Sequence, residues 1–376
     1  MCYKRSMPTK LTLVMVAKVA PEILKTCLRS VKEYIDAYII VVDPGDLDSH
    51  QIAAREILSD LPGGVFEHPW KNVAVNRTKA FQIAKEKVES DYLLVLDADD
   101  YLQVNTNLPP TDEYKFDKNK LTADIYELEI IDGPNNYWRP QIFKADLPNL
   151  RYEGSFHEYV NCDKKMETTR LHELQYIRIF ASLTPEQQVT KYKKFIVGLK
   201  KELAADPTNA RHAYYLAQSY KDAFMFNEAL QAYKKRAEMP GWDEETWRAM
   251  YEAAMLHEKL NHSESTIIAA YLNAFEFRPK RAEPLYELAR YLRLKKKHSI
   301  AFIFASQASS ISQPQDERWL VDSSIYDWKA VDELAVSSFY VPGKRELSKQ
   351  LHEHLVANPH VPEDDKARIR SNLTFF

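Results

Sequence analysis

The sequence predicts an α/β domain with a Rossmann-like, mostly parallel sheet over residues 1–180, followed by an all-α domain of helical repeats over residues 181–376. In the first part, apolar runs typical of buried strands alternate with segments whose apolar residues recur at helical spacing. From about Thr184 onward, the helical spacing is almost continuous. Turn residues also become sparse there, since only three of the eight glycines follow, namely Gly198, Gly241 and Gly343.

The N-terminal elements follow one another as strand, helix, strand and helix. Residues 11–16 form an apolar run, and Pro21 then marks a helix start. A second apolar run at 38–42 ends in Asp43. The apolar positions of the two helices that follow these strands are Leu24, Cys27, Leu28, Val31 and Ile35 for the first, and Ile52, Ala53 and Ile57 for the second.

A third helix with Ala80, Phe81, Ala84 and Val88 on its apolar face leads into a strand at 92–96. Three parallel strands with crossover helices place helices on both faces of the sheet. Beyond Asp100 the pattern predicts strands at 125–131 and 141–143 with a turn at 133–136 between them. We expect these strands to add to the sheet in antiparallel orientation.

The C-terminal part shows spacing typical of tetratricopeptide helix pairs. A first pair includes Tyr215, Leu216, Ala217, Tyr220, Ala229, Tyr233 and Pro240. The small residues Ala217 and Ala229 fall where two helices of such a pair touch closely. Leu285, Leu288, Ala289, Leu292, Ala301 and Ala305 repeat the pattern, and residues 247–279 form a looser copy between them. Trp242, Trp247, Trp319 and Trp328 are expected in the core or at an interface rather than as stacking platforms for a ligand.

Composition excludes several classes of protein. Lys and Arg total 51 against 54 Asp and Glu, which leaves no general positive field for nucleic acid. The cysteines Cys2, Cys27 and Cys162 are too few for a disulfide framework or a zinc knuckle, which predicts a reducing compartment. The longest early apolar stretch, residues 11–20, is interrupted by Lys18 and is too short to span a bilayer. We therefore expect a cytoplasmic protein that does not bind membranes, with Cys27 in its core.

The most informative segment is DADDY, residues 97–101, directly after the strand at 92–96. A buried parallel strand that ends in carboxylates places them at the carboxyl edge of the sheet, where α/β domains bind ligands. Asp97 and Asp99 are two residues apart and can converge on one hard cation such as Mg²⁺ or Mn²⁺. The alternative is an acidic turn that caps the next segment.

Asp43 ends the second strand at the same edge, where a carboxylate can accept hydrogen bonds from a ribose or a base. Its alternative role is to cap the turn at 44–46. Arg77, near the start of the third helix, could meet a diphosphate with its planar guanidinium. For Lys79 in the same helix, a solvated surface position is the preferred interpretation.

The segment YEGSFHE, residues 152–158, is the second informative site. His157 offers an imidazole able to bind a cation such as manganese, and Glu158 offers a carboxylate able to act as a base. A purely structural histidine is the alternative. The sequence has no GxxxxGK[ST], GxGxxG, GxSxG or HExxH motif, so P-loop kinases, dinucleotide oxidoreductases, serine hydrolases and zincins lack support.

Taken together, these segments resemble a family 2, GT-A-type glycosyltransferase. The resemblance is carried in order by LTLVMVAKVAPEILKTCLRSV, VVDPGDLDS, NRTKAF, LDADD and YEGSFHE. The helical repeats narrow it to family 2 transferases fused to tetratricopeptide repeats, a group that includes bacteriocin S-glycosyltransferases and many viral and phage relatives.

The resemblance implies roles for individual residues. Asp43 resembles the nucleotide-contacting Asp, and Asp97 and Asp99 resemble the DxD pair, with Asp99 the better candidate for direct metal contact. His157 matches the His of the family's HE element, which completes the metal shell or contacts the diphosphate. Glu158 is then the first candidate for the catalytic base.

Other positions keep alternatives open. Asp132 and Asp100 are the other candidates for the catalytic base. Many relatives read Lys-Asn-Glu where this chain has Lys18-Val19-Ala20, so Lys18 is the retained nucleotide contact and donor preference could differ.

The resemblance implies an inverting hexosyl- or pentosyltransferase that uses Mn²⁺ or Mg²⁺ and a nucleotide sugar, foremost a UDP-sugar. The acceptor is a peptide, protein, glycan or modified nucleobase, and we expect a homodimer through the helical domain. One alternative is an inactive, transferase-like scaffold that binds proteins through its repeats. Another is a nucleotidyltransferase, which would normally carry a glycine-rich, basic loop after the first strand, and residues 18–21 form no such loop.

Overall fold

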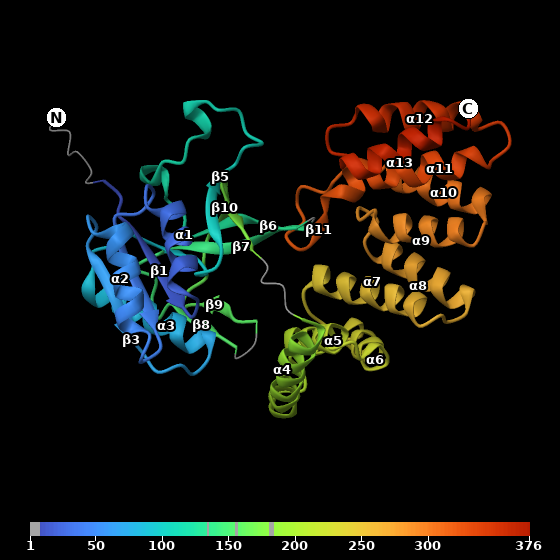
Figure 1. Ribbon diagram of the computed structural model, residues 1–376. Helices are drawn as coiled ribbons and strands as arrows, with labels where there is room; N and C mark the ends of the chain where they lie inside the picture. The colour runs from blue at the N-terminus through green and yellow to red at the C-terminus, as the bar shows by residue number, and fades with distance from the viewer. Residues whose placement is uncertain (1–7, 134, 155–156, 180–183) are drawn as a thin grey trace. The chain divides into compact units, whose positions relative to one another are not determined.

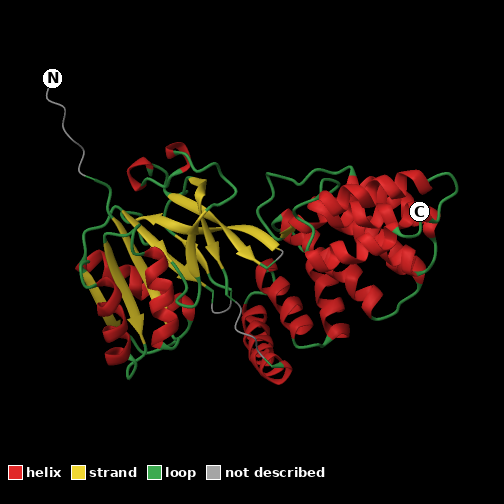
Figure 2. Cartoon of the chain, turned by 45° about the horizontal axis from the view of Figure 1, so that its top comes forward, coloured by secondary structure: helices red, strands yellow, loops and turns green. Residues whose placement is uncertain are grey.

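The computed structural model describes residues 8–133, 135–154, 157–179 and 184–376 (Figure 1). Contacts divide the chain into an N-terminal unit, residues 1–182, and a C-terminal unit, residues 183–376. The N-terminal unit is a sheet flanked by helices, and the C-terminal unit is built almost entirely of helices (Figure 2). The predicted order of an α/β domain and a helical-repeat domain is confirmed.

The main sheet of the N-terminal unit has the strand order β3-β2-β1-β4-β7-β6-β10-β5. Strands β3, β2, β1 and β4 are parallel. Strand β7 is antiparallel to β4 and to β6, so β6 runs in the same direction as β4. The strands are β1 (Leu11–Ala17), β2 (Ala37–Val42), β3 (Gly63–Glu67), β4 (Tyr92–Val95), β5 (Tyr101–Val104), β6 (Ile125–Asp132), β7 (Asn135–Lys144) and β10 (Thr168–Ile177).

Helices cover both faces of this sheet, as predicted. Helices α1 (Pro21–Val31) and α2 (Leu47–Leu58) pack on one face, where Leu28 and Ala54 are fully buried with Leu13 and Ile40. Helix α3 (Val73–Lys87) packs on the other, where Phe81 joins residues of β1, β2 and β4. Because β1, β2 and β4 are buried on both faces, they read as continuous apolar runs in the sequence.

The structure corrects several details of the prediction. Strand β3 was not predicted, because it begins with Gly63 and Gly64, which have little strand propensity. Strand β7 begins at residue 135, so it takes up part of the predicted turn at 133–136, of which Pro134 lies outside the described residues. Ile52 was expected on the apolar face of α2 but is 66% exposed.

Smaller elements complete the N-terminal unit. Strands β8 (Arg151–Glu153) and β9 (Tyr159–Asn161) form a separate hairpin. The connection from β5 to β6 carries two short 3₁₀ turns, Asp112–Tyr114 and Lys118–Lys120. Since β5 is antiparallel to β10 and β10 is parallel to β6, this connection lies at the edge of the sheet where β6 begins, opposite the carboxyl edge.

The C-terminal unit begins with a capping box, in which the Thr184 hydroxyl accepts from the Gln187 amide and the Gln187 side chain accepts from the Thr184 amide. Its helices are α4 (Pro185–Ala205), α5 (Ala210–Asp222), α6 (Phe226–Ala237), α7 (Asp243–Lys259), α8 (Glu264–Phe277), α9 (Glu283–Leu294), α10 (His298–Ser309), α11 (Ala330–Phe339), α12 (Arg345–Ala357) and α13 (Glu363–Leu373). Short elements at Val321–Asp322 (β11) and Ile325–Lys329 (a π turn) precede α11.

The predicted helix pairs are present as α5 with α6, α7 with α8 and α9 with α10. Ala217 and Ala229 are fully buried, as are Ala289, Ala301 and Ala305 in the later pair. Small side chains at these positions allow close approach of the two helices in each pair. Trp247 and Trp328 are buried as expected, but Trp242 is 43% exposed and stacks on Trp319.

The turns within these three pairs share one backbone conformation. Phe224, Asn261 and Lys296 each have a positive φ, of 60°, 54° and 60°. The residue after each donates its amide to a carbonyl five residues earlier, as in Met225 to Tyr220. This is a Schellman ending, which usually carries glycine at the left-handed position. The repeat was visible in the sequence but these endings were not, because no glycine marks them.

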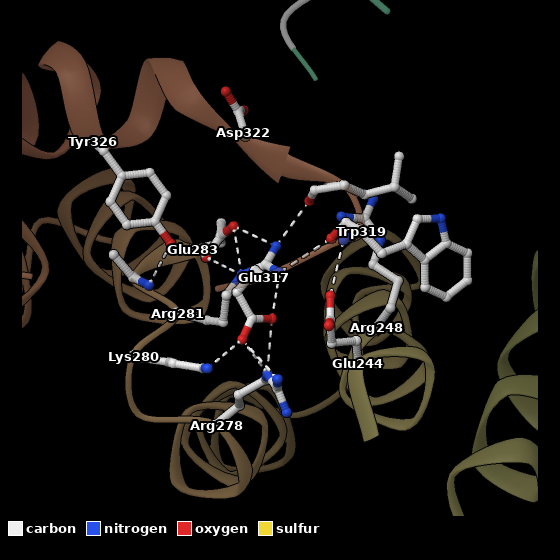
Figure 3. Close-up of polar contacts among 12 residues, drawn as sticks. Glu244, Arg248, Arg278, Lys280, Arg281, Glu283, Glu317, Trp319, Asp322 and Tyr326 are labelled. Carbon is white, nitrogen blue, oxygen red and sulfur yellow. Dashed lines mark hydrogen bonds and ion pairs between the residues drawn. The ribbon is translucent and has the colours of Figure 1, made fainter. Parts of the chain in front are cut away.

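A buried ionic network fastens the segment before β11 to the helix pairs (Figure 3). Arg281 and Glu317 have fully buried side chains, and Arg281 also pairs with Glu283. Glu244 accepts the amides of Arg318 and Trp319 at 2.8 Å each. Arg281 and Glu317 are paired with opposite charges and Glu244 is held by backbone amides, so the network ties this connection to the start of α7 and to the residues at the start of α9. Among the described residues, no helix is long and apolar enough to cross a membrane.

Candidate active site

The predicted site residues follow strands that end at one edge of the sheet. Lys18 follows β1, Asp43 follows β2 and Asp97 lies just beyond β4. Asp132 is the last residue of β6, which runs parallel to β4 within the sheet order. The carboxyl edge therefore gathers these four residues, as the sequence predicted for Asp43 and Asp97.

Residues 97–100 form a tight turn, closed by a hydrogen bond of 3.1 Å from the Asp100 amide to the Asp97 carbonyl. Asp97 is partly buried, Ala98 and Asp100 are buried, and Asp99 is exposed. The Asp100 carboxylate accepts the Ile179 amide at 2.8 Å. The turn therefore directs one carboxylate to solvent and holds two against the protein.

Asp97 is paired with two arginines. Its Oδ1 atom accepts from Arg77, and its Oδ2 atom accepts from Arg139 at 3.3 Å. Burial opposes ionisation of Asp97, but the guanidinium groups of Arg77 and Arg139 prevail and hold its pKa well below the usual range. Asp97 is therefore a carboxylate at neutral pH, and its oxygens accept from these arginines rather than from backbone amides of the described residues that follow it.

Arg77 connects this turn to the second predicted motif. One of its terminal nitrogens donates to Asp97 and the other donates to Glu158. The guanidinium also lies over the ring of Tyr152, 5.2 Å from the ring centre. The structure thus brings Arg77, Asp97 and Glu158 together, although the sequence reading had assigned each to a separate motif.

His157 precedes Glu158 with a φ of 54°, in the left-handed region. Ser155 and Phe156 of the same motif lie outside the described residues. Glu158 has a side chain only 16% exposed, so it sits close against Arg77 rather than in open solvent. The left-handed residue marks a sharp change of chain direction just before the candidate base.

A second charged group lies at the same edge. Arg178 donates to Asp132 at 3.1 Å and reaches within 4.0 Å of Asp100. Burial raises the pKa of Asp100 to about 6, against the hydrogen bond from the Ile179 amide. Burial also raises the pKa of Asp132, and Arg178 opposes this shift. The pKa values of both carboxyls are therefore raised above that of a solvated aspartate, and perturbed pKa values are typical of functional sites.

Lys18 and Asp43 meet through Trp70, in the segment after β3. The Asp43 Oδ1 atom accepts the Trp70 amide at 3.0 Å. The Lys18 ammonium lies over the Trp70 ring, 4.6 Å from its centre. The carboxylate of Asp43 therefore binds the neighbouring loop rather than capping its own turn. Trp70 was not singled out from the sequence, because β3 itself was not predicted.

Residues 12–171 match the family model described as Glycosyl transferase family 2. The N-terminal unit is a family 2 glycosyltransferase domain. The matched segment contains β1 to β4 and the turn at 97–100, and it includes the segment with His157 and Glu158. The chain therefore carries a glycosyltransferase domain joined to helical repeats.

Solved structures are similar to parts of this chain. MamA is 19% identical with a TM-score of 0.37, over 50% of this chain and 99% of MamA. BtubC from P. vanneervenii is 14% identical with a TM-score of 0.39, over 51% of this chain and 82% of BtubC. Residues 1–349 of S. aureus TarS are 14% identical with a TM-score of 0.31, over 70% of this chain and 83% of that structure. No curated protein matches the chain.

The residues of the glycosyltransferase domain are compatible with a divalent cation held jointly with a substrate. In the part of the chain that the structure describes, no three His, Cys, Asp or Glu side chains form a group that could hold a metal ion. Mg²⁺ sites for phosphate substrates, however, use one or two carboxylates together with phosphate oxygens and water. Asp99 is exposed and can supply such a ligand, whereas both oxygens of Asp97 already accept from arginines.

Several residues of the site were missed in the sequence. Arg139 comes from β7, and Tyr176 and Arg178 come from β10 and the residue after it. Arg139 contacts Asp97 and lies over the Tyr176 ring, 4.8 Å from its centre. Arg139 lies outside the strand predicted at 141–143, because β7 is longer than its apolar run, so the pattern did not mark it. No signal marked β10 either, because exposed polar side chains interrupt its apolar pattern.

Proposed function

We propose that the glycosyltransferase domain transfers a hexosyl or pentosyl group from a nucleoside diphosphate sugar, foremost a UDP-sugar, to an acceptor with inversion at the anomeric carbon. The observation that carries this proposal is the turn at 97–100. It presents Asp99 to solvent beside the Arg77, Asp97 and Glu158 cluster, within a family 2 domain. A diphosphate donor needs such an arrangement of ligands and cations around its leaving group.

Asp99 is the first metal ligand in this proposal, and His157 is the second, with Asp97 in support. A bound Mn²⁺ or Mg²⁺ would supply charge neutralisation for the departing diphosphate. Asp97 supports the site mainly by keeping Arg77 and Arg139 in place, since each of its oxygens accepts from one of them. The guanidinium of Arg77 lies close enough to this turn to meet the diphosphate as well.

The nucleoside end of the donor is assigned to the group around Trp70. Lys18 covers one part of the Trp70 ring, and Asp43 is fixed by the Trp70 amide. A fixed carboxylate can accept hydrogen bonds from a ribose or a base. This group and the turn at 97–100 follow neighbouring strands, β2, β1 and β4, so one extended donor can reach both.

The base that takes the acceptor proton is assigned first to Glu158 and second to Asp132. Glu158 is held by Arg77 at the centre of the site. Asp132 lies farther along the sheet edge and has a pKa raised by burial, which makes its carboxylate a stronger base than a solvated aspartate. Replacing each by its amide, Glu158→Gln and Asp132→Asn, separates the two assignments. The true base is the one whose replacement lowers kcat without weakening binding of the nucleotide sugar.

The acceptor is a peptide, protein, glycan or modified nucleobase, and the helical repeats hold the acceptor or a second copy of the chain. Tetratricopeptide arrays present extended surfaces suited to both uses. We further propose a homodimer through the C-terminal unit and a cytoplasmic location. Sedimentation of the purified chain at micromolar concentration tests the dimer, and a monomer there would refute it.

The donor assignment is tested by thermal unfolding with UDP-, GDP- and dTDP-sugars in the presence and absence of Mn²⁺. A donor that binds the folded state raises the midpoint of unfolding. Asp99→Asn should abolish the manganese-dependent part of this shift and lower turnover or donor hydrolysis by about 100-fold. Asp112→Asn is the matched control, because Asp112 is exposed in the connection at the opposite edge of the sheet.

The same experiment decides against the proposal if no nucleotide sugar stabilises the folded protein, with or without Mn²⁺. That result would favour the alternative, an inactive transferase-like scaffold that acts through its helical repeats. A donor shift that Asp99→Asn leaves unchanged would instead reject the metal-ligand assignment and keep the donor assignment.

A further inference from the structure

The two ends of the turn at 97–100 are held by the same strand end. The Asp97 amide donates to the Tyr176 hydroxyl at 3.0 Å. The Asp100 carboxylate accepts the Ile179 amide at 2.8 Å. Tyr176 lies near the end of β10, and Ile179 follows two residues after the strand. The β10 end therefore supplies one partner to the first residue of the turn and one to its last residue.

The fixed ends leave one carboxylate directed outward. Ala98 is 3% exposed and Asp100 is 4% exposed, whereas Asp99 between them is exposed. The closing bond from the Asp100 amide to the Asp97 carbonyl sets the backbone between these two anchors. With both ends fixed, the direction of the Asp99 side chain depends on anchors that Asp99 does not itself contact.

Tyr176 also supports the arginine on the other side of Asp97. Its side chain is fully buried, and its ring lies under the guanidinium of Arg139. Arg139 in turn donates to the Oδ2 atom of Asp97. One tyrosine thus contributes its hydroxyl to the backbone of Asp97 and its ring to a partner of the Asp97 side chain.

We propose that Tyr176 is a positioning residue, which holds the turn at 97–100 so that Asp99 faces the bound cation and diphosphate. This inference rests on the proposed function of Asp99. Tyr176 and Ile179 lie beyond residues 12–171, the segment matched by the family model. The strand end that fixes the turn therefore lies outside the matched segment. Groups that orient a metal ligand commonly change metal affinity or activity by about 10- to 100-fold when they are removed.

The test compares Tyr176→Phe with Tyr92→Phe. Phenylalanine at 176 keeps the ring under Arg139 and removes only the hydroxyl that accepts the Asp97 amide. Tyr92 is the matched control, because it is a buried tyrosine at the other end of β4 and donates its hydroxyl to the Ala123 carbonyl at 3.1 Å. Both variants lose one buried hydroxyl of the same sheet, but only one of these hydroxyls touches the turn.

Two readouts are measured for each variant: hydrogen exchange at the Asp97 amide and calorimetric binding of Mn²⁺ in the presence of UDP. For Tyr176→Phe we expect faster exchange at the Asp97 amide and an affinity for manganese lowered about 10-fold. For Tyr92→Phe we expect wild-type values in both readouts. Wild-type manganese affinity in a folded Tyr176→Phe variant would overturn the proposal.

Ile179→Pro provides a second variant if Tyr176→Phe unfolds. Proline removes the amide that donates to Asp100, and the Ile179 side chain is 49% exposed, so the core is not altered. It should lower manganese affinity in the same way, and an unchanged affinity would again count against positioning by the β10 end. Asp99→Asn separates a failure of the metal-ligand assignment from a failure of the Tyr176 proposal. If this variant retains manganese binding in the presence of UDP, the assignment of Asp99 as a metal ligand is wrong, whatever the Tyr176 variant shows.

Discussion

The Arg77 guanidinium lies between the carboxylates of Asp97 and Glu158 and donates to both. This relationship joins the end of β4 to the segment after β8, although neither is near the other in the sequence. The Arg77 guanidinium therefore fixes the distance between the turn at 97–100 and Glu158, the first candidate for the catalytic base. The arrangement leads to predictions for the site, and the rest of the fold supplies others.

Replacing Arg77 by methionine should destabilise the N-terminal unit. The change leaves Asp97 and Glu158 partly buried without their shared cation, which costs about 3 to 5 kcal/mol of unfolding free energy for a buried pair. Combining Arg77→Met with Asp97→Asn should cost less than the sum of the single changes, with a coupling energy of about 1 to 3 kcal/mol. Urea unfolding of the full chain measures each term.

Lys79→Met is the control for this cycle, because it removes a cation from the same helix. Lys79 is partly buried, and we expect the effect of its replacement on the unfolding free energy to stay within about 0.5 kcal/mol, as for substitutions away from buried ion pairs. If Arg77→Met and Lys79→Met lowered the unfolding free energy equally, the ion pairs of Arg77 would contribute little to stability.

Asp100→Asn should change how stability depends on pH. The pKa of Asp100 in the folded protein is about 6, above the value of about 3.9 for an unfolded aspartate. Its folded form therefore binds the proton more tightly, and its stabilising contribution is lost as pH rises from about 4 to about 6. Over this pH interval, the free energy of unfolding of Asp100→Asn should rise by about 2 to 3 kcal/mol relative to that of the wild type.

Chemical unfolding at several pH values, with chelator present, tests this prediction. Asparagine keeps an oxygen for the Ile179 amide, so the comparison isolates the charge. The exposed Asp112→Asn variant should show no such gain. A pH-independent difference between Asp100→Asn and wild type would mean that Asp100 titrates normally in the folded chain.

Glu317→Ala should strongly destabilise the C-terminal unit. Its carboxylate is fully buried and pairs with Arg278 and Arg281, so its loss leaves Arg278 without this partner and leaves the buried Arg281 with only the Glu283 carboxylate of the two that it pairs with (Figure 3). The expected cost is about 3 to 5 kcal/mol. Asp316→Ala removes the neighbouring carboxylate, which is 73% exposed and paired with Lys280, and should cost about 1 kcal/mol or less. If both variants lost similar amounts of unfolding free energy, the burial of Glu317 would not explain the expected difference between them.

Lys296→Gly should stabilise the pair formed by α9 and α10. Lys296 has a φ of 60°, a conformation that costs a non-glycine residue about 1 to 2 kcal/mol. Glycine removes this cost but adds chain entropy to the unfolded state, so a net gain of about 0.5 to 1 kcal/mol is expected. Lys295→Gly is the control, because Lys295 has a φ of −82° and glycine there should only destabilise. Thermal unfolding of the two variants gives the comparison, and a loss of stability for Lys296→Gly would show that its side chain matters more than its backbone.

Local sequence determined the outlines of both units. The apolar runs of β1, β2 and β4 identify strands buried on both faces, and the helical spacing beyond Thr184 identifies the repeats. Chain order also placed Asp43 and Asp97 at one sheet edge, because parallel strands joined by crossovers end on the same side. These features depend on residues close together in the chain, which is why a pattern could predict them.

The partners of the site were decided by tertiary structure. Arg139 reaches Asp97 because β7 inserts antiparallel beside β4, and Tyr176 reaches the same turn because β10 runs parallel to β6. A shift of one residue in either strand would turn these side chains to the opposite face. The sequence by itself determined the DADDY turn and its place after a buried strand. Only strand order and register decided which of its carboxylates is paired with arginine, which is buried and which faces solvent.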